Sequence, residues 1–550
     1  MFKKFKDYQL RLAFVLCGFV LIYIVIVVRL FLLQIYQQNF FKELALNQYQ
    51  ISMKINMPRG VIYDRTGQCP LAFNCSAQSA FILPHQFTET KKIEHFLKHN
   101  YPAVYKKLKN HPEKYFFWVD RVLSDFQIKK IKSYNLKDII FIDEPRRVYP
   151  SAAAAHLIGF SDIDGRGISG IEIEFEQWLA GKQAHLTVQR DARSNNFYFE
   201  KNIDKIGAKG NPLVLTIDGK LQTLAFEALK DAVEHYQAIS GSVLVMDPET
   251  GQVLTMANYP TFNPNQKGIT DLSITKNFIV TECFELGSVM KVFLAMSGFA
   301  EKVVTSDEIF DCEGKIAYVN GFKVENWKSL GVMPFSDCIK FSSNVVCAKV
   351  STRLGSKLYD HLTKIGFGVK TGIELPGERN GFVNPPSRWS RSSPLVMSFG
   401  YEITASLLQL GRAFCVFSNG GYLVQPTIVL EPKKNGQYPK KTKIYDDEII
   451  QEMRSVLKGI GDLHHIKGCL IMGKTGTARC AQGHGYSQSE HLYTFAGIVE
   501  KGDYKRVIVT FINRPQKVHL WASEVAAPLF QRVAERMILL DAQDKKQIMI

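Results

Sequence analysis

Three short patterns in the sequence hold the residue types that nucleophilic catalysis requires. They are Ser288-Val-Met-Lys291, Ser342-Ser-Asn344 and Lys474-Thr-Gly-Thr477. A serine hydroxyl needs an adjacent base to become a nucleophile, and a lysine amine can serve when burial or a neighbouring cation lowers its pKa. The patterns therefore predict a serine nucleophile with a lysine base, and Lys474 is the natural neighbouring cation.

Ser288 is expected at the beginning of a helix. Phe284-Glu-Leu-Gly287 precedes it, and the apolar run Val292-Phe-Leu-Ala-Met296 follows. The glycine turn would bring the hydroxyl to a helix N-terminus, where unpaired backbone N–H groups face the group that it attacks. Lys291 lies one turn further along the same face, so its amine can reach the hydroxyl.

Lys474-Thr-Gly-Thr477 continues a strand that begins at Leu470. Gly476 removes a side chain where a substrate backbone would lie alongside the strand. Thr475 and Thr477 can donate their hydroxyls to a substrate carboxylate, which the ammonium of Lys474 also binds. This pattern predicts a carboxylate-binding strand.

Every pattern has further matches, so context must select among them. The further matches are Ser273-Ile-Thr-Lys276, Ser455-Val-Leu-Lys458, Ser194-Asn-Asn196 and Lys370-Thr-Gly372. The two serine–lysine copies lack a glycine turn that leads into a helix, and Lys370 falls in a loop bounded by glycine and proline. We interpret Ser273 and Ser455 as helix-surface residues and reject the loop copy.

A formal match to the phosphate-binding loop G-x-x-x-x-G-K-[ST] overlaps the third pattern. It runs from Gly468 to Thr475. That loop needs a strand before it and a helix after it. Here a helical pattern precedes, the intervening residues are strand-like, and Gly476 disfavours a following helix. The sequence therefore argues against a nucleotide-hydrolysing enzyme.

The elements that would position the three patterns come from distant parts of residues 213–545. We expect a strand at 213–218, an amphipathic helix after it, a hairpin of 242–247 with 252–257, strands at 470–472, 494–499 and 507–512, and a closing helix at 524–540. Strands at both ends with helices between them predict one sheet assembled from distant segments, in an α+β or α/β domain. Residues 40–205 form a separate accessory region.

The first forty residues indicate the compartment. Leu12 to Val28 is free of charge, and Leu30 to Leu33 extend the apolar stretch to membrane thickness. The N-terminal side is basic, with Lys3, Lys4, Lys6 and Arg11. We therefore predict a cytoplasmic tail at 1–11, a single anchor at 12–35 and an exported remainder. A cleaved signal peptide is the alternative, but no small-x-small cleavage site follows the apolar run.

The composition narrows the class further. The chain has 550 residues, 46% hydrophobic and 22% charged, with a net charge of +16. This composition excludes a disordered chain, and Lys and Arg are too dispersed to predict nucleic-acid binding. The ten cysteines do not form a disulfide framework. Cys69 with Cys75 and Cys469 with Cys480 are the close pairs. The spacing of Cys480, His484 and His491 matches no zinc pattern, so we predict no metal or cofactor.

With these residues in order, the chain resembles the class B penicillin-binding proteins, membrane-anchored D,D-transpeptidases that cross-link peptidoglycan. The likeness covers almost the whole chain. Segments similar to the family's N-terminal pedestal are Pro58-Arg-Gly-Val-Ile-Tyr-Asp-Arg-Thr-Gly67, Arg147-Val-Tyr-Pro150, His156-Leu-Ile-Gly159 and Gly167-Ile-Ser-Gly-Ile-Glu172. Segments similar to the transpeptidase domain are Leu215-Thr-Ile-Asp218, Asp247-Pro-Glu-Thr-Gly251, Thr371-Gly-Ile-Glu-Leu-Pro-Gly377 and Ala526-Ala-Pro528. Ser398-Phe-Gly-Tyr401 and Leu407-Leu-Gln-Leu410 look more like the division-specific branch.

The resemblance implies a transpeptidase fold, with an antiparallel sheet flanked by helices at 213–545 behind an elongated mixed α/β pedestal at 40–205. It implies that Ser288 attacks a D-Ala-D-Ala stem while Lys291 takes its proton. Ser342 would relay a proton, and Asn344 would hold Lys291 and the substrate amide. Lys474, Thr475 and Thr477 would bind the terminal carboxylate beside Gly476.

The resemblance also implies partners and a location. These are peptidoglycan stem peptides, β-lactams as covalent ligands, the inner membrane, divisome proteins and a SEDS-type lipid II polymerase, with the bulk of the chain periplasmic. Two residues depart from the family pattern: Leu286 replaces the usual proline before the serine, and Glu402 stands where glycine is common. Two alternatives stay open, a catalytically silent penicillin-binding division scaffold and a β-lactam sensor or hydrolase.

Overall fold

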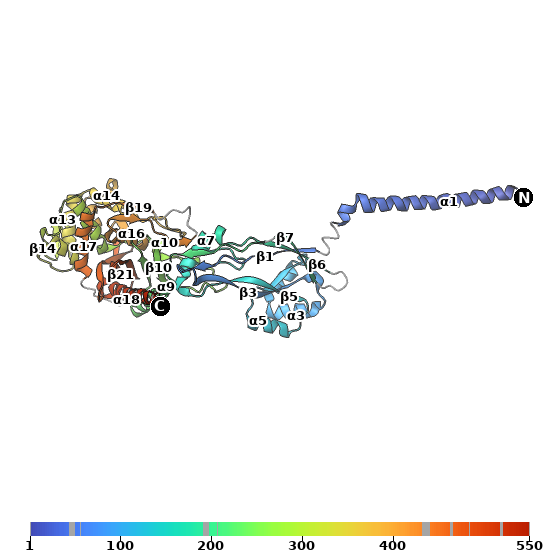
Figure 1. Cartoon of the computed structure of the whole chain (residues 1–550), viewed down its shortest axis with the longest axis horizontal. Coiled ribbons are helices and arrows are strands. Elements are labelled where there is room, and N and C mark those ends of the chain that lie inside the picture. Colours follow the sequence, from blue (N-terminus) through green and yellow to red (C-terminus); the bar gives the residue numbers. More distant parts are fainter. Residues whose placement is uncertain are drawn as a thin grey trace. The chain divides into compact units, whose positions relative to one another are not determined.

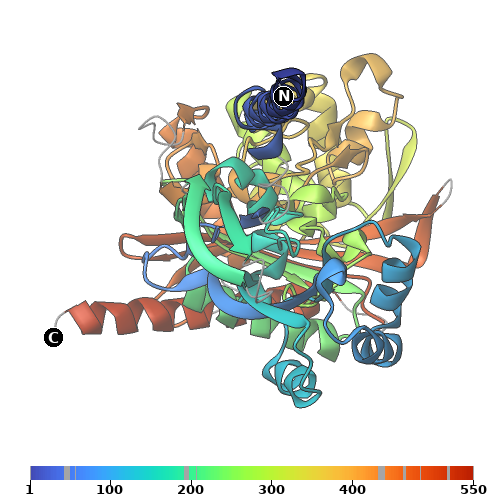
Figure 2. The same ribbon diagram turned by 90° about the vertical axis from the view of Figure 1, so that its right-hand side faces the viewer.

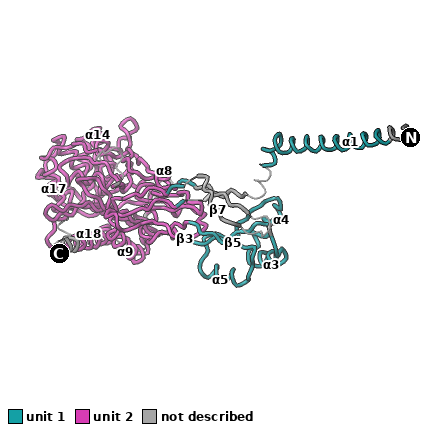
Figure 3. The backbone as a smooth tube through the Cα atoms, turned by 45° about the vertical axis from the view of Figure 1, so that its right-hand side comes forward, with its two compact units in different colours: residues 1–57, 77–144, 182–208 teal, residues 58–76, 145–181, 209–550 magenta. Residues whose placement is uncertain are grey.

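The structure is a computed structural model of the chain. It describes residues 2–42, 50–55, 57–190, 197–205, 207–431, 440–461, 466–482, 485–516 and 521–548. The serine–asparagine copy at 194–196 and His484 lie outside these ranges. Figure 3 shows two compact units: unit 1 is 1–57, 77–144 and 182–208, and unit 2 is 58–76, 145–181 and 209–550. Segments 58–76 and 145–181, which we assigned to the pedestal region, thus belong to unit 2.

The chain begins with a long apolar helix. Helix α1 spans Phe2–Phe31, and a π-helical turn η1 continues it over Leu32–Tyr36. The stretch Tyr8–Tyr36 is strongly apolar, and its most apolar part is not buried within the structure. In the described ranges it is the one helix long and apolar enough to cross a membrane.

Unit 1 combines short helices with strands. Helices α3 (Thr90–Asn100), α4 (Pro102–Asn110) and α5 (Asp125–Ser133) accompany β4 (Phe117–Asp120) and the first part of β5 (Ile139–Val148). Strand β3 (Pro70–Ile82) starts in unit 2 and ends in unit 1. Strands β1 (Gln50–Ile55), β6 (Ala184–Arg190) and β7 (Phe197–Lys205) form an antiparallel sheet. A small apolar core around Ile93, Phe96 and Leu97 holds the helical part.

The centre of unit 2 is a five-stranded antiparallel sheet, of which β10 and β21 are labelled in Figure 1. Its strand order is β10-β9-β22-β21-β20. Its strands are β9 (Ser240–Met246), β10 (Val253–Tyr259), β20 (Leu470–Gln482), β21 (Gly485–Lys501) and β22 (Tyr504–Asn513). The hairpin and the three C-terminal strands are confirmed, and β20 and β21 are longer than expected. Residues from both ends of unit 2 thus share one sheet, because β9 pairs with β22.

Both faces of this sheet are covered by helices. On β9, Val243 and Val245 face α9 (Gly219–His235) and α18 (Ala522–Ile548), while Leu244 and Met246 belong to the core on the other face. Helices α11 (Lys291–Ala300) and α16 (Leu407–Ser418) lie in that second core. Figure 2 shows α18 in red on one side of the strands and yellow and orange helices on the other. The expected sheet flanked by helices is confirmed.

The remaining elements of unit 2 are mostly short. The helices are α6 (Ala155–Ile158), α7 (Gly170–Glu174), α8 (Glu176–Leu179), α10 (Phe278–Thr281), α14 (Lys357–Lys364), α15 (Ser393–Met397) and α17 (Asp447–Gly461). The strands are β2 (Ile62–Tyr63), β8 (Leu213–Leu215), β11 (Ile309–Asp311), β12 (Ile316–Val319), β13 (Phe322–Glu325), β14 (Val332–Pro334), β15 (Phe382–Val383), β16 (Ile403–Thr404), β17 (Tyr422–Val424), β18 (Val429–Glu431) and β19 (Lys441–Lys443).

A buried ion cluster joins segments 58–76 and 145–181, which both belong to unit 2. Glu172 is fully buried and accepts hydrogen bonds from Arg59 Nε at 2.8 Å and Arg147 Nε at 2.7 Å. The hydroxyl of Tyr149 donates to the same carboxylate. A buried carboxylate is costly unless its charge is compensated, so this cluster holds the two segments together. Strand β2 pairs with β8 in parallel, and Tyr149 N donates to Asn265, which joins both segments to the rest of unit 2.

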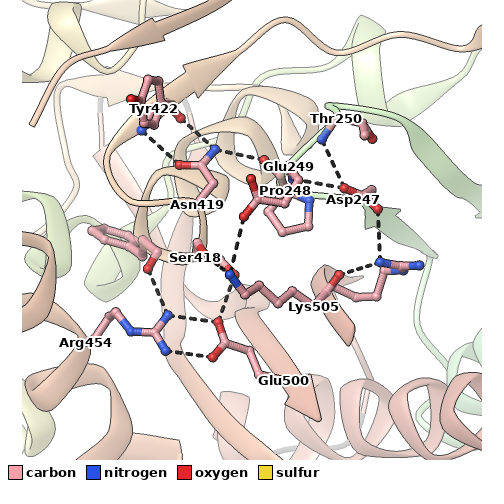
Figure 4. A network of polar contacts seen from close by, with 12 residues as sticks. Asp247, Pro248, Glu249, Thr250, Ser418, Asn419, Tyr422, Arg454, Glu500 and Lys505 are labelled. Atoms are coloured by element: carbon pink, nitrogen blue, oxygen red, sulfur yellow. Dashed lines mark hydrogen bonds and ion pairs between the residues drawn. The ribbon is translucent and has the colours of Figure 1, made fainter. Parts of the chain in front are cut away.

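A second polar network joins α16 and α17 to the end of the sheet (Figure 4). Glu500 near the end of β21 accepts two hydrogen bonds from Arg454 on α17, at 2.8 and 2.7 Å, and one from Ser418. Lys505 on β22 donates to the backbone of Ser418 and pairs with Glu249. In register, Glu500 lies opposite Leu470, the first residue of β20. The network therefore anchors the end of the sheet from which the strand carrying Lys474 begins.

Candidate active site

Ser288 lies where the sequence predicted, at the start of an apolar helix. A 3₁₀ turn, η5 (Gly287–Met290), leads into α11 (Lys291–Ala300). Gly287 has a φ of +54°, a conformation that favours glycine. Residues 291–299 of α11 are buried, so the helix is rigidly packed, while Ser288 remains half-buried. The turn thus presents the serine from a fixed base.

The amine of Lys291 is fully buried and uses all three of its donors. Its Nζ donates to Ser342 O at 2.7 Å, to Ser342 Oγ at 3.0 Å and to Asn344 Oδ1 at 2.6 Å. Burial lowers the pKa of Lys291 to about 8, although the nearby Cys347 thiol opposes the shift. An amine with this pKa releases a proton far more easily than an exposed lysine.

The Ser342–Asn344 turn connects two helices, α12 (Phe335–Lys340) and α13 (Asn344–Leu354). Ser342 has a φ of +64°, a strained conformation for a residue with a side chain. Ser343 caps α13, because its hydroxyl accepts a hydrogen bond from Val346 N. The middle serine of the pattern is therefore structural, and its neighbours carry the groups that meet Lys291.

Lys474 lies on β20, at the edge of the sheet, and its side chain is buried. Its Nζ is 3.4 Å from Ser342 Oγ and donates to Thr475 O at 3.1 Å. Burial, together with the charge of Lys291, lowers the pKa of Lys474 to about 7. Ser342 Oγ therefore stands between two buried amines that disfavour each other's protonation.

Close backbone packing brings the serine turn against β20. A side chain on Gly287 would come within 2.5 Å of Thr477 O, and one on Gly476 within 2.6 Å of Leu286 O. Gly400 packs against Gly287 in the same way. We expected Gly476 to leave room for a substrate backbone, but the turn itself fills that space.

The structure brings most of the predicted site residues together, but the expected contact between Ser288 and Lys291 is not formed. Lys291, Ser342, Asn344 and Lys474 share one hydrogen-bond network. Within the described ranges, no hydrogen bond joins Ser288 Oγ to Lys291, because the three donors of the amine are engaged elsewhere. Such contacts commonly form only when substrate binds. Thr475 and Thr477 are half-buried on the same strand.

The other matches lie outside this site. Ser273 and Ser455 are exposed, on the short turn η4 (Leu272–Thr275) and on α17. Lys370 is exposed, and Thr371 donates to Glu378, so that copy shapes a loop. The formal phosphate-loop match is part of antiparallel strand β20, with no helix after it in the described part of the chain.

Sequence reasoning missed several residues that support the site. Asn326 is buried, and its Oδ1 accepts from Asn344 N at 2.8 Å, which fixes the start of α13. Glu285 accepts hydrogen bonds from Tyr486 OH and Glu402 N, and its burial raises its pKa. Glu402 has a φ of +56°, which explains why glycine is usual there. Only this last position carried a signal in the sequence.

The family follows from comparison with known proteins. Residues 241–535 match the model of the penicillin binding protein transpeptidase domain, and residues 54–215 match the penicillin-binding protein dimerisation domain. This chain belongs to the penicillin-binding protein transpeptidase family. The first match covers more than half of the chain and contains all eight predicted site residues.

Relatives of the family extend over nearly the whole chain. A probable peptidoglycan D,D-transpeptidase PenA of Neisseria gonorrhoeae is 30% identical and covers 95% of this chain and 91% of its own length. Peptidoglycan D,D-transpeptidase FtsI of Escherichia coli is 28% identical, over 87% of this chain and 82% of its own. Penicillin binding protein 3 of Mycobacterium tuberculosis, solved with aztreonam, has a TM-score of 0.68 at 25% identity, over 89% of this chain and 97% of its own. The resemblance to the class B family and its fold is thus confirmed.

Proposed function

We propose that this chain is a membrane-anchored serine D,D-transpeptidase that cross-links peptidoglycan stem peptides in septal wall synthesis, and that β-lactams acylate it. The observation that carries the proposal is the network in which two buried lysines, Lys291 and Lys474, meet at Ser342 Oγ beside Ser288. The names of the relatives PenA and FtsI support the same reaction.

In the proposed reaction, Ser288 Oγ attacks the carbonyl carbon of the penultimate D-alanine while its proton passes to neutral Lys291. The backbone N–H groups of Ser288 and Thr477 stabilise the oxyanion. Contact between Gly287 and Thr477 O supports this role, because it places the two backbones side by side. Ser342 then delivers a proton to the departing D-alanine, and the acyl group passes to an amine of a second stem.

The other site residues bind substrate. Lys474, Thr475 and Thr477 hold the terminal carboxylate, as an ammonium and two hydroxyls on one strand can do. Asn344 Nδ2 donates one hydrogen to Glu325 O at 2.7 Å, which leaves its second hydrogen for the substrate amide. Domain 213–545 would thus carry the reaction, with 40–205 as its pedestal.

We also propose a location and partners. The basic residues before the apolar stretch that starts at Leu12 outnumber the single acidic residue, Asp7, which favours a cytoplasmic N-terminus and a periplasmic remainder, held at the inner membrane. A SEDS-type lipid II polymerase and divisome proteins are proposed as partners from the family resemblance. A reporter fused after the last residue would test the orientation, because alkaline phosphatase is active only when exported.

The test is covalent labelling with a fluorescent penicillin. Full-length wild type should be labelled on Ser288, shown by the mass of the modified peptide, and Ser288→Ala should not be labelled. Ser455→Ala is the matched control, because Ser455 also precedes a lysine by three residues but is exposed on α17. Absence of labelling in a folded wild type would support the silent scaffold instead. For a transpeptidase we expect the penicillin adduct on Ser288 to persist. Fast loss of the label would favour a hydrolase instead.

A further inference from the structure

Two buried cysteines contact each other beneath the active site. The Sγ atoms of Cys312 and Cys338 are 3.5 Å apart, and both residues are fully buried. Cys312 directly follows β11, and Cys338 lies on α12. All ten cysteines are thiols in the structure. These two are 26 positions apart in the sequence, so spacing did not single them out.

The backbones of both cysteines support the Ser342–Asn344 turn. The carbonyl of Cys338 accepts a hydrogen bond from Ser343 N at 2.8 Å. The carbonyl of Cys312 accepts from Asn326 Nδ2 at 3.1 Å, and Asn326 in turn accepts from Asn344 N. A disulfide between Cys312 and Cys338 would therefore link the two backbone segments that hold the Ser342–Asn344 turn through these hydrogen bonds.

We propose that Cys312 and Cys338 form an intramolecular disulfide that positions Ser342 and Asn344. The sulfurs must approach by about 1.5 Å to reach the S–S bond length near 2 Å. The inference rests on the proposed location, because disulfides persist in oxidising compartments outside the cytoplasm.

The reaction is thiol–disulfide exchange with an oxidised dithiol protein. One cysteine thiolate attacks the disulfide of the oxidant and forms a mixed disulfide, and the thiolate of the other cysteine then displaces the oxidant. The two cysteines together lose two protons and two electrons, and the oxidant becomes a dithiol. The sulfurs are fully buried, and burial raises the pKa of Cys338, so exchange belongs to folding and not to the finished structure.

A third buried cysteine offers an internal competitor. Cys347 on α13 lies near both sulfurs and both site lysines, as their mutual electrostatic effects show. Burial raises the pKa of Cys347 to about 11, so it is a neutral thiol at physiological pH. We expect it to remain reduced, because the sulfur contact at 3.5 Å is the one between Cys312 and Cys338.

The first experiment maps the thiols. Full-length protein is extracted from cells in the presence of N-ethylmaleimide and denaturant, and peptides are mapped without reduction. We expect one cross-linked peptide pair containing Cys312 and Cys338, and alkylated Cys347. Two alkylated cysteines at 312 and 338, or a link from either one to Cys347, would overturn the proposal. Purified reduced protein, refolded in a glutathione redox buffer, tests formation of the bond without depending on the location.

The second experiment tests the positioning role. Reduction should lower the Tm of wild type by about 4 °C and slow its acylation by penicillin severalfold at 25 °C. The double variant Cys312→Ala/Cys338→Ala should acylate slowly with or without reductant. Cys415→Ala is the matched control, because Cys415 is equally buried but lies on α16. An unchanged acylation rate after full reduction would refute the positioning role. If the bond forms but penicillin never labels Ser288, the proposed function fails and the disulfide stands.

Discussion

Replacing Lys474 with methionine should move the pH dependence of acylation to higher pH. The substitution removes one of two buried positive charges and keeps the length of the side chain. The Nζ atoms of Lys474 and Lys291 lie 3.4 and 3.0 Å from Ser342 Oγ, so they are at most about 6 Å apart. Like charges at that separation repel by about 3 kcal/mol at an effective dielectric constant near 20. This energy corresponds to about a hundredfold in an acid dissociation constant.

The sign follows from which form of Lys291 reacts. Neutral Lys291 accepts the proton of Ser288, so acylation should rise as pH increases through the pKa of the buried pair. Burial and the charge of Lys291 lower the pKa of Lys474 to about 7, and burial lowers that of Lys291 to about 8. Because the repulsion acts on both amines equally, the first proton can leave the wild-type pair from either amine near pH 7. Without Lys474, Lys291 keeps its proton up to the pKa of about 8 that burial sets, so the midpoint should move up by about one pH unit.

The assay is the second-order rate of acylation by a penicillin, followed by intact mass from about pH 6 to pH 10. Loss of carboxylate binding should slow Lys474→Met at every pH, so the midpoint and not the rate is the diagnostic quantity. Lys370→Met is the matched control, because Lys370 begins the exposed copy of the same pattern. This variant should leave both the midpoint and the rate of acylation unchanged. A midpoint that stays in place or moves to lower pH would refute the coupling of the two amines.

Three further perturbations follow from the packing of the site. Gly476→Ala should reduce the rate of acylation at least tenfold and destabilise the domain by about 1–3 kcal/mol in thermal unfolding, because the new Cβ would lie 2.6 Å from Leu286 O. Full activity of this variant would show that the turn carrying Ser288 can move away from β20. Asn326→Ala should cost about 1–3 kcal/mol and slow acylation, because Cys312 O, Asn344 N and Val345 N each lose the hydrogen bond to this side chain. A loss of stability without a change in rate would contradict its positioning role. Arg454→Met should cost about 2–3 kcal/mol near pH 7, because it leaves the buried Glu500 ionised without its arginine partner. Burial raises the pKa of Glu500, but Arg454 outweighs it and lowers the pKa overall. The pair therefore stabilises the fold above the ordinary glutamate pKa of about 4.3, and the contribution disappears as acid protonates the carboxyl. A difference between the Arg454 variant and wild type that grows below pH 4 would contradict this.

The sequence was informative where local chemistry and local structure coincide. Gly287 before an apolar run predicts the turn at Ser288, and two apolar runs on either side of Pro248-Glu-Thr-Gly251 predict the hairpin. The extension of β20 beyond Thr477 to Gln482 was not predictable, because these residues join the strand by pairing with β21, which begins only after it. Long-range pairing of this kind leaves little trace in the local pattern.

The residues that support the site could not be predicted either, because their roles depend on contacts between segments that are distant in the sequence. Asn326 is 18 positions from Asn344, and the segment around it resembles any polar loop; its role depends on the approach of β13 to α13. The contact of Cys312 with Cys338 likewise depends on how α12 packs. The division of the chain was also non-local, since segments 58–76 and 145–181 join unit 2 through the pairing of β2 with β8 and the hydrogen bond from Tyr149 N to Asn265.

The interlocking of Gly287, Gly400 and Gly476 has a consequence for drug resistance. Each of the three lacks space for even one additional carbon atom, and the obstructing atoms include main-chain oxygens that cannot rotate away. Substitutions selected by β-lactams should therefore spare these positions.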